Sequence, residues 1–550
     1  MPKIDIPLNT PLTFRTNDVT KDAKMVNCYK ETVAGKVYCV KRPGKQNFTL
    51  STPLPAPGQG LHVYNNDLYA VANGSLYTIT GGTTTSLLSG LNNVNSISWV
   101  NTEATTSPHP YMVFHDEVTG YYRSATGETH VINKEVYEVA ILTGGAGYPA
   151  AGTFTVSGSI SGTGATGTYT ADVSGAITQC TMTDRGHDYA GTLTVTFSGS
   201  PTTAATYVVN LNAFPNNPVS GLVYLDGYVF VMDGDATVWQ SELEDPTAWN
   251  PINYITVLGE PDKGVAIVKH FNYLVAFKQW TTEFLYDNAN PVGNVLAINS
   301  TARIELGCAT GESVQQFEET VLWMATTKEG GRSIAMLDGL RAHPISTKAI
   351  ETFLNASTLQ GVYSWAYKIS GHTFYGLVLT DQNITLVYDL QEKEWHIWTT
   401  NKQFIGGGEN YFECSYVTPF PVNSNNYYVL DAVNGLMFTL SPNFYVDPFG
   451  PVTMRVVTQS STMGTFDRKV NSMLTIWGEQ INDIMQVRHT DDDYNTWSAY
   501  RPIQLNLQKP CLYNLGAYRR RAYEFLYTGH FPLRLEYAET THTGNVGQQG

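Results

Sequence analysis

The residues best suited to chemistry form an acidic turn near the end of the sequence. The segment reads Thr490-Asp491-Asp492-Asp493-Tyr494-Asn495-Thr496-Trp497-Ser498. It resembles an Asp-box, a hairpin turn of pattern S-x-D-x-G-x-T-W, and departs from it at Thr490 and Tyr494. In such turns the aspartate accepts hydrogen bonds from backbone amides, which is a structural role. Three adjacent carboxylates also attract cations. We favour the structural role, and predict an Asp-box-like turn at Asp491, Asp492, Asp493 and Trp497.

The densest basic run of the sequence is a second candidate site. Arg519, Arg520 and Arg521 lie between Tyr518 and Tyr523. Because neighbouring side chains on a strand point to opposite faces, one of these arginines must be paired, or the strand lies at a sheet edge. A solvated edge strand is one interpretation. The other is a docking surface for an acidic partner or for DNA phosphates, and the three arginines are our candidate partner-docking residues.

The remaining polar residues give no pattern of a catalytic or metal site. His109 and His115 share one face of a predicted strand, but six residues place them about 20 Å apart, too far to bind one metal ion. The sequence has no G-x-S-x-G, Walker or H-E-x-x-H motif. No spacing singles out a catalytic pair of carboxylates. We therefore predict no catalytic residue, no metal, no cofactor and no enzymatic activity.

The composition favours strands and turns and disfavours a protein that grips nucleic acid. The 550 residues include 34 Tyr and 48 Gly, and only 15% are charged, against about 25% in an average soluble protein. The net charge of −15 disfavours a nucleic-acid-binding face, which is usually basic. No run of eighteen apolar residues predicts a membrane span, and no apolar segment near Met1 predicts a secretory signal. The six cysteines are scattered and predict neither a zinc nor a redox motif.

A recurring hairpin is the main signal of the fold. Apolar and aromatic strands come in pairs joined by a turn, roughly every fifty residues, and one such hairpin cannot bury its own apolar face. A ring of hairpins packed sheet on sheet solves this problem, which predicts a β-propeller; a large β-sandwich assembly is the alternative. The six pairs are 68–71 with 74–77, 228–231 with 238–239, 273–277 with 282–286, 321–324 with 333–336, 373–378 with 385–388, and 427–430 with 436–438.

The sequence divides into five parts around this array. Residues 135–213 contain two copies of one pattern, a strand, a glycine turn, a tyrosine and a strand of alternating Thr and apolar residues. Such an alternation predicts strands with one buried face, and an insertion at a surface loop costs least. Helix signals are scarce, and the best covers 348–354. We predict an all-β protein with an extended segment at 1–60, a propeller-like core at 61–134 and 214–445, an inserted β-domain at 135–213, a β-sandwich-like domain at 446–541 and a flexible tail at 542–550.

Several stretches together resemble one family, the packaged-DNA stabilisation or tail nozzle (tail hub) proteins of short-tailed bacteriophages. The resemblance covers most of the chain except about 135–213, and its order and spacing carry it. The stretches are 26–29, 41–44, 344–347, 349–351, 364–367, 371–375, 386–390, 395–398, 465–466, 491–498, 519–521 and 531–535.

The resemblance implies a specific role. The chain would form a six-fold ring in the virion tail, below the portal and adaptor rings, after synthesis in the host cytoplasm. The ring would continue the DNA channel, help retain the packaged genome and guide its ejection. Its partners would be an adaptor protein, a plug or needle protein, and tail fibres or spikes. Double-stranded DNA would pass without sequence-specific binding, and six copies at −15 would carry −90.

A second hypothesis from a different class follows from the acidic turn and the many Tyr and Trp residues. Both features are also found in propellers that bind or hydrolyse glycans. A sialidase-like site would need three arginines that converge in the propeller mouth, and the sequence offers no clear set. The glycan hypothesis therefore stands as the alternative to the structural phage protein.

Overall fold

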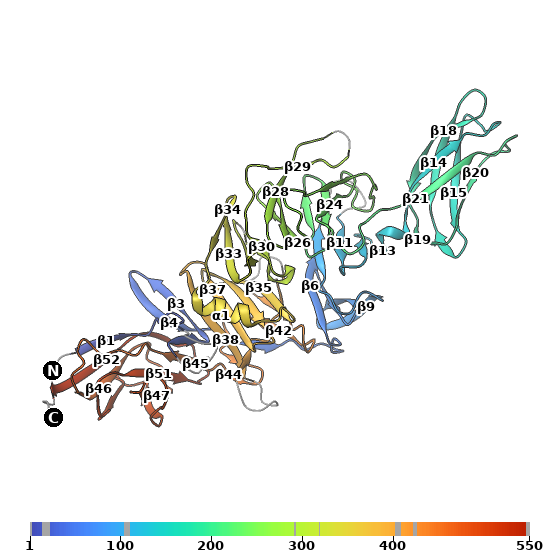
Figure 1. Cartoon of the computed structure of the whole chain (residues 1–550). Helices are drawn as coiled ribbons and strands as arrows, with labels where there is room; N and C mark the ends of the chain where they lie inside the picture. Colours follow the sequence, from blue (N-terminus) through green and yellow to red (C-terminus); the bar gives the residue numbers. More distant parts are fainter. Residues whose placement is uncertain are drawn as a thin grey trace.

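The computed structural model confirms the all-β fold class. It describes residues 3–13, 22–103, 110–290, 293–317, 319–401, 409–421 and 426–545. The molecule is elongated, with a propeller in the middle, an inserted unit at one end and both termini at the other (Figure 1). In the described part of the chain the one α-helix is α1 (Lys348–Ala356), where a helix is predicted from 348 to 354. No helix of these residues is both long and apolar enough to cross a membrane.

Seven antiparallel sheets form the blades of the propeller, and the first four are simple meanders. Their strands, from the inner to the outer edge, are as follows. Blade 1 has β6 (Gly58–Tyr64), β7 (Asp67–Ala72), β8 (Ser75–Thr80) and β9 (Thr83–Ser89); blade 2 has β10 (Ser98–Asn101), β11 (Met112–His115), β12 (Gly120–Arg123) and β13 (Thr129–Val131); blade 3 has β22 (Val223–Leu225), β23 (Tyr228–Met232), β24 (Thr237–Gln240) and β25 (Tyr254–Thr256); blade 4 has β26 (Gly264–His270), β27 (Tyr273–Lys278), β28 (Thr282–Asp287) and β29 (Leu296–Ile298).

The last three blades include strands that come from outside the simple meander. Blade 5 has β30 (Gly307–Cys308) and β31 (Gln315–Gln316), both paired with β32 (Val321–Thr326), then β33 (Arg332–Asp338) and β34 (Arg341–Pro344); blade 6 has β35 (Val362–Ile369), β36 (His372–Leu379), β37 (Ile384–Asp389) and β38 (Glu394–Asn401), with β39 (Glu409–Tyr411) beside β38; blade 7 has β40 (Tyr416–Pro419), β41 (Tyr427–Leu430), β42 (Met437–Leu440) and β5 (Lys45–Asn47). Thus a strand from the start of the chain completes the final blade.

The ring of blades closes because each consecutive pair of blades shares an apolar core. The inner strands contact one another around the ring, and β40 of blade 7 contacts β6 of blade 1. Separate clusters of buried residues lie between each blade and the next, including one between blades 7 and 1 around Leu61, Leu68 and Leu430. Each hairpin therefore buries its apolar face against its neighbours, which is the reason the hairpin pattern predicts a propeller.

The six predicted hairpins are the central strands of blades 1, 3, 4, 5, 6 and 7. The sequence pattern missed blade 2, whose central hairpin is β11 with β12. All four side chains of β11 are buried, and β11 and β12 are each only four residues long.

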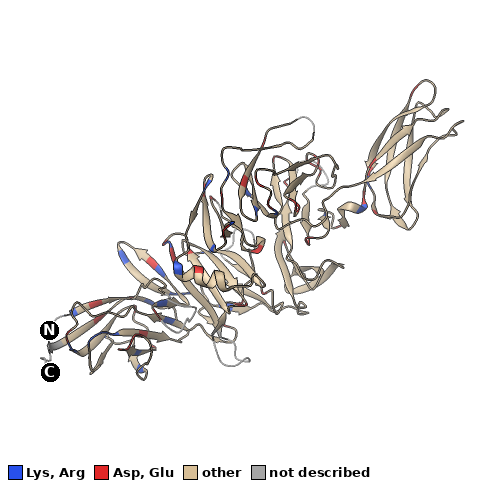
Figure 2. Cartoon of the chain, in the orientation of Figure 1, with Lys and Arg blue, Asp and Glu red and all other residues tan. Residues whose placement is uncertain are grey.

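The inserted unit follows blade 2 and precedes blade 3. Its strands are β14 (Val136–Thr143), β15 (Ala151–Gly158), β16 (Ser161–Thr163), β17 (Thr166–Ala171), β18 (Ile177–Asp184), β19 (His187–Ala190), β20 (Leu193–Phe197) and β21 (Thr206–Leu211). The second strands of the two sequence repeats, β15 and β20, pair with each other. The repeats' tyrosines have matching roles, since the Tyr148 hydroxyl accepts from Ala205 N and the Tyr189 hydroxyl accepts from Ala165 N. Charged residues are sparse beyond the base of this unit (Figure 2).

The C-terminal region is a sandwich of two sheets that share strands with the N-terminal segment. One sheet runs β3-β4-β52-β46-β49, with β1 on β52 and β50 on β46; the other continues blade 6 as β38-β2-β45-β51-β47-β48. The strands are β1 (Lys3–Pro7), β2 (Lys24–Val26), β3 (Cys28–Val33), β4 (Lys36–Lys41), β45 (Met454–Val457), β46 (Lys469–Gly478), β47 (Ile484–Thr490), β48 (Arg501–Gln504), β49 (Cys511–Tyr513), β50 (Ala517–Tyr518), β51 (Ala522–Tyr527) and β52 (Arg534–Asn545), beside the small pair β43 (Val446–Asp447) and β44 (Gly450–Pro451).

The two sheets enclose one apolar core, to which both ends of the chain contribute. It includes Ile6 and Met25 from the start of the chain and Val456, Leu474 and Phe525 from its end. Residues 1–60 thus supply β1 to β5 to three different sheets. The limits of the five predicted parts stay predictions.

Candidate interaction surfaces

The acidic turn joins β47 to β48 and is organised by one carboxylate. Asp492 Oδ1 accepts from Thr490 Oγ1 at 2.8 Å and from the Thr496 amide at 2.9 Å, and Oδ2 accepts from Thr496 Oγ1 at 2.6 Å. These hydrogen bonds to Thr496 and Thr490 lower the pKa of Asp492 to about 2. The hydrogen bonds therefore hold the turn, and the Asp-box-like assignment stays a prediction.

Tyr494 stands where the Asp-box pattern has glycine, and it anchors the turn to the sandwich. Its φ of 66° lies in the left-handed region, which explains why the pattern prefers glycine there. The side chain is buried beside Val457 and Ala522. Its hydroxyl donates to Thr458 O at 2.9 Å and accepts from the Ser460 amide at 2.8 Å. Tyr494 therefore adopts a backbone conformation that glycine would adopt more easily, and its packed, hydrogen-bonded side chain compensates for this.

The arginine run lies in the bend between β50 and β51, so it is not a continuous strand as the edge-strand interpretation assumed. Arg521 is buried, and its guanidinium binds both carboxylate oxygens of Asp491 at 2.7 and 2.8 Å. Arg520 pairs with Asp493 at 2.9 Å, with both side chains partly exposed. Arg519 is exposed and donates to Phe466 O at 3.0 Å.

The two candidate motifs are therefore one cluster, in which two aspartates of the turn neutralise two arginines of the bend. Thr490 of β47 is paired with Ala522 of β51, and this register brings the turn beside the bend. A buried arginine held by both of its partner's oxygens is a structural element. The predicted docking role stays a prediction, and exposed charge for it comes from Arg519 and Arg520.

A groove of about 400 Å³ lies beside this cluster, between blade 6 and the sandwich. Trp497 lines it, and the Arg488 guanidinium stacks on the rings of Trp497 and Tyr500 at 4.7 and 4.5 Å. Glu524 in its floor binds both Arg488 and Arg455. The groove therefore presents an aromatic surface with two arginines around one carboxylate.

A buried network of hydrogen bonds around Arg42 holds the sandwich to the propeller. The Arg42 guanidinium donates to Asp447 Oδ2 at 2.7 Å, to Thr399 O at 2.7 Å and to Asn27 Oδ1 at 2.8 Å. Asn27, with a φ of 56°, in turn donates to Thr399 Oγ1 and Thr453 O. Arg42 and Asp447 are both almost fully buried. The stretches 26–29 and 41–44, which carry the family resemblance, thus meet where propeller and sandwich join.

The propeller axis holds a polar cavity of about 850 Å³ that the sequence did not indicate. Blades 2 to 6 contribute to its lining, which includes Glu117 and Glu312. Burial raises the pKa of both carboxyls to about 7, and each has another acidic residue close by. No arginine is among the described residues that line the cavity, whereas a sialidase-like site needs three. The cavity suits a neutral or cationic occupant better than an anionic one.

The remaining residues considered in the sequence have ordinary positions. His115 is buried with a hydrogen bond to Gly221 O, and burial lowers its pKa to about 4; His109 lies outside the described residues. Trp395 and Trp398 are core residues, whereas Trp477 is 40% exposed. The six cysteines are all free thiols.

Comparison with known proteins identifies one family. The family model described as Bacteriophage P22 Gp10, beta-propeller matches residues 119–443. Among solved structures, a streptogramin B lyase is 9% identical over 72% of this chain and 97% of its own, with a TM-score of 0.37. BamB from Moraxella catarrhalis is 8% identical over 80% and 98%, and the computationally designed Ika8 protein is 11% identical over 72% and 99%, each with a TM-score of 0.32. Comparison with curated proteins gives no match.

Proposed function

The chain belongs to the phage family described as Bacteriophage P22 Gp10, beta-propeller, and from this premise we propose that it forms the nozzle ring of a short-tailed phage. It is a structural phage protein. The observation that carries the proposal is the family match, which runs from β12 of blade 2 to β42 of blade 7 and includes the inserted unit. In the proposed ring, six copies continue the DNA channel below the adaptor, retain the packaged genome and guide its ejection.

The charge of the chain supports a passage for DNA. A wall rich in lysine and arginine would gain counterion-release free energy at every phosphate and would hold the strand. This chain has 33 basic and 48 acidic residues, and its most buried arginines are already paired with aspartates. An acidic ring guides DNA by repulsion and lets it move.

The partners of the ring follow from its position in the tail. We propose that the adaptor protein binds the exposed arginines of the bend, Arg519 and Arg520, through acidic side chains. The plug or needle protein would close the channel, and tail fibres or spikes would attach outside it. The ring is assembled in the host cytoplasm and remains in the virion tail.

Electron microscopy tests the ring. The purified chain is imaged alone and after mixing with the adaptor ring, and six-fold rings with a central opening are expected in the mixture. Phage lacking this chain should fill with DNA and then lose it, and purified chain should restore retention. If particles without the chain keep their genome and infect normally, the proposed function is wrong. A chain that binds the adaptor as single copies would contradict the ring.

A further inference from the structure

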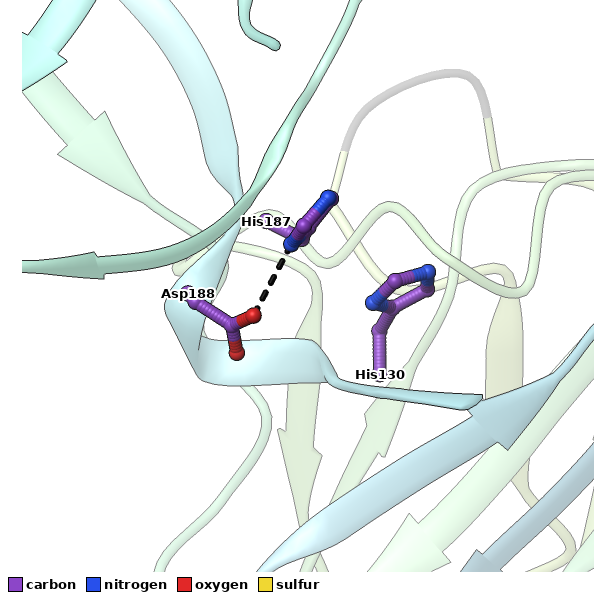
Figure 3. Close-up of side chains that lie close together, drawn as sticks. All are labelled: His130, His187 and Asp188. Atoms are coloured by element: carbon purple, nitrogen blue, oxygen red, sulfur yellow. Dashed lines mark hydrogen bonds and ion pairs between the residues drawn. The ribbon is translucent and has the colours of Figure 1, made fainter. Parts of the chain in front are cut away.

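Two histidines and an aspartate meet where the inserted unit touches the propeller (Figure 3). His130 comes from β13, the outer strand of blade 2, while His187 and Asp188 begin β19 of the insert. The two imidazole rings stack with centroids 4.5 Å apart, and His187 Nδ1 lies 2.9 Å from Asp188 Oδ2. One ligand atom from each of the three residues lies within 4.8 Å of the others.

We propose that His130, His187 and Asp188 bind a divalent first-row transition metal ion, with Zn²⁺ the best match, which clamps the insert to blade 2. Imidazole nitrogens and a carboxylate oxygen are ligands that zinc prefers. Bonds of about 2.0–2.1 Å to tetrahedral zinc place ligand atoms about 3.3 Å apart. The ligand atoms lie within 4.8 Å of one another, so rotation of the side chains has to shorten the longest separation by about 1.5 Å.

A fourth ligand is at hand beside these three residues. Glu128 Oε2 lies 3.9 Å from His130 Nε2, and its side chain is largely exposed, so it can turn toward the ion. A water molecule would serve equally, as it does in zinc sites with three protein ligands. The acidic groups that act on His130 are Glu128 and Asp188, and their negative charge favours a cation.

The position of the cluster gives the metal a mechanical role. Between β13 and β19 the chain runs out through β14 and back through β18, so the ion would link two points 57 residues apart. A cross-link that closes a long loop limits the orientations available to the ends. The clamp would thus fix the angle at which the insert projects from the propeller. This inference does not depend on the ring proposed above.

Calorimetric titration of the full chain with Zn²⁺ tests the site. One equivalent is expected to bind, and His130→Ala and His187→Ala should each weaken binding at least about tenfold, because one of three protein ligands is lost. His343→Ala is the matched control, since His343 also lies near an aspartate, Asp338 at 4.0 Å, without a second histidine. It should leave binding unchanged.

A second measurement separates a clamp from loose surface binding. Co²⁺ bound to the wild type should give the strong visible absorption of tetrahedral coordination, and hydrogen exchange of the β19 amides should slow when metal is added. Both effects should disappear in His130→Ala, whose fold is checked by circular dichroism. Three results would each overturn the proposal. The wild type would bind no Zn²⁺, or His130→Ala would bind it with the same affinity as the wild type, or hydrogen exchange of the β19 amides would be the same with and without metal.

Discussion

The propeller carries a second unit at each end, and the two junctions are built differently. At the sandwich, β2 pairs with β38 of blade 6 and with β45, so one sheet runs from propeller to sandwich. The Arg42–Asp447 pair beside it is almost fully buried. At the insert, the corresponding ion pair is Arg185 with Asp245 at 3.2 Å, and its side chains are 24% and 38% exposed.

The insert junction relies on hydrogen bonds rather than on a shared sheet. Tyr122 donates to the buried Glu135, and Tyr137 donates to Glu242 at 2.9 Å. No strand of the insert pairs with a blade in the described residues. The difference indicates that the sandwich and the propeller fold as one body, whereas the insert is an attachment whose position depends on a few polar contacts.

Deleting each unit in turn should give the largest difference between the two junctions. Removing residues 446–545 exposes β2, β3 and β4 and the apolar core that they share with the sandwich, so we expect an insoluble chain. Replacing 137–210 by a short Gly-Ser linker should leave a soluble propeller, because Val136 and Leu211 are paired neighbours. Soluble expression and circular dichroism measure both outcomes. An insert deletion that aggregates would show that the two junctions are equally integral.

Matched arginine substitutions should give the next largest difference. Arg42→Ala leaves Asp447 charged and buried, at an expected cost of about 3–5 kcal/mol in the free energy of unfolding. Arg185→Ala removes a half-exposed pair and should cost only about 0.2–1 kcal/mol. Urea unfolding followed by tryptophan fluorescence measures both values. Equal midpoints for the two variants would contradict the distinction between a buried and an exposed junction.

The two junctions should also respond to pH with opposite signs. Burial raises the pKa of Glu135 to about 8, so its contribution to stability is complete below the ordinary carboxyl pKa and is lost as the pH rises through 8. Burial, helped by Arg42, lowers the pKa of Lys41 to about 8. The folded state then binds fewer protons than the unfolded state above pH 8, and stability rises with pH toward the ordinary lysine pKa.

Substituting Glu135 or Lys41 isolates the contribution of each residue to the pH dependence of the free energy of unfolding. Relative to Glu135→Gln, the wild type should lose on the order of 2 kcal/mol between pH 6 and 8. Relative to Lys41→Met, it should gain on the order of 2 kcal/mol between pH 8 and 10. Melting temperatures across the pH range, compared variant by variant, supply the test. Parallel curves for wild type and both variants would mean that neither group titrates in these intervals.

The propeller could be predicted from the sequence because its signal is local. In each predicted hairpin one strand, such as 273–277, is followed within a few residues by the strand with which it pairs. The apolar pattern and the turn therefore lie in one short stretch of sequence. The strands that close and extend the fold carry no such signal. Lys45 of β5 pairs with Leu440 of β42, and Val26 of β2 pairs with Ile397 of β38, and a three-residue strand does not specify so distant a partner.

The candidate sites show the same limit. The sequence singled out the acidic turn and the arginine run as separate motifs, and only the register of β47 on β51 joins Asp491 to Arg521. Glu117 with Glu312, and His130 with His187, come from different blades or units and have no spacing that a motif could describe. Residue types can be read from one segment, but a site made from several segments depends on pairing that the sequence does not display.

Substitution of the exposed arginines of the bend should have the smallest effect on stability. Its effect on binding tests which end of the molecule contacts the adaptor. Arg519→Ala with Arg520→Ala removes one partly exposed ion pair, so unfolding should change by about 1 kcal/mol or less. Binding to the adaptor ring, measured by co-sedimentation, should nevertheless be lost, since we propose that the adaptor binds these two side chains. The insert deletion is the counterpart at the other end and should bind as the wild type does. If instead the insert deletion no longer binds the adaptor and the double variant still does, the docking surface lies on the insert and not on the sandwich.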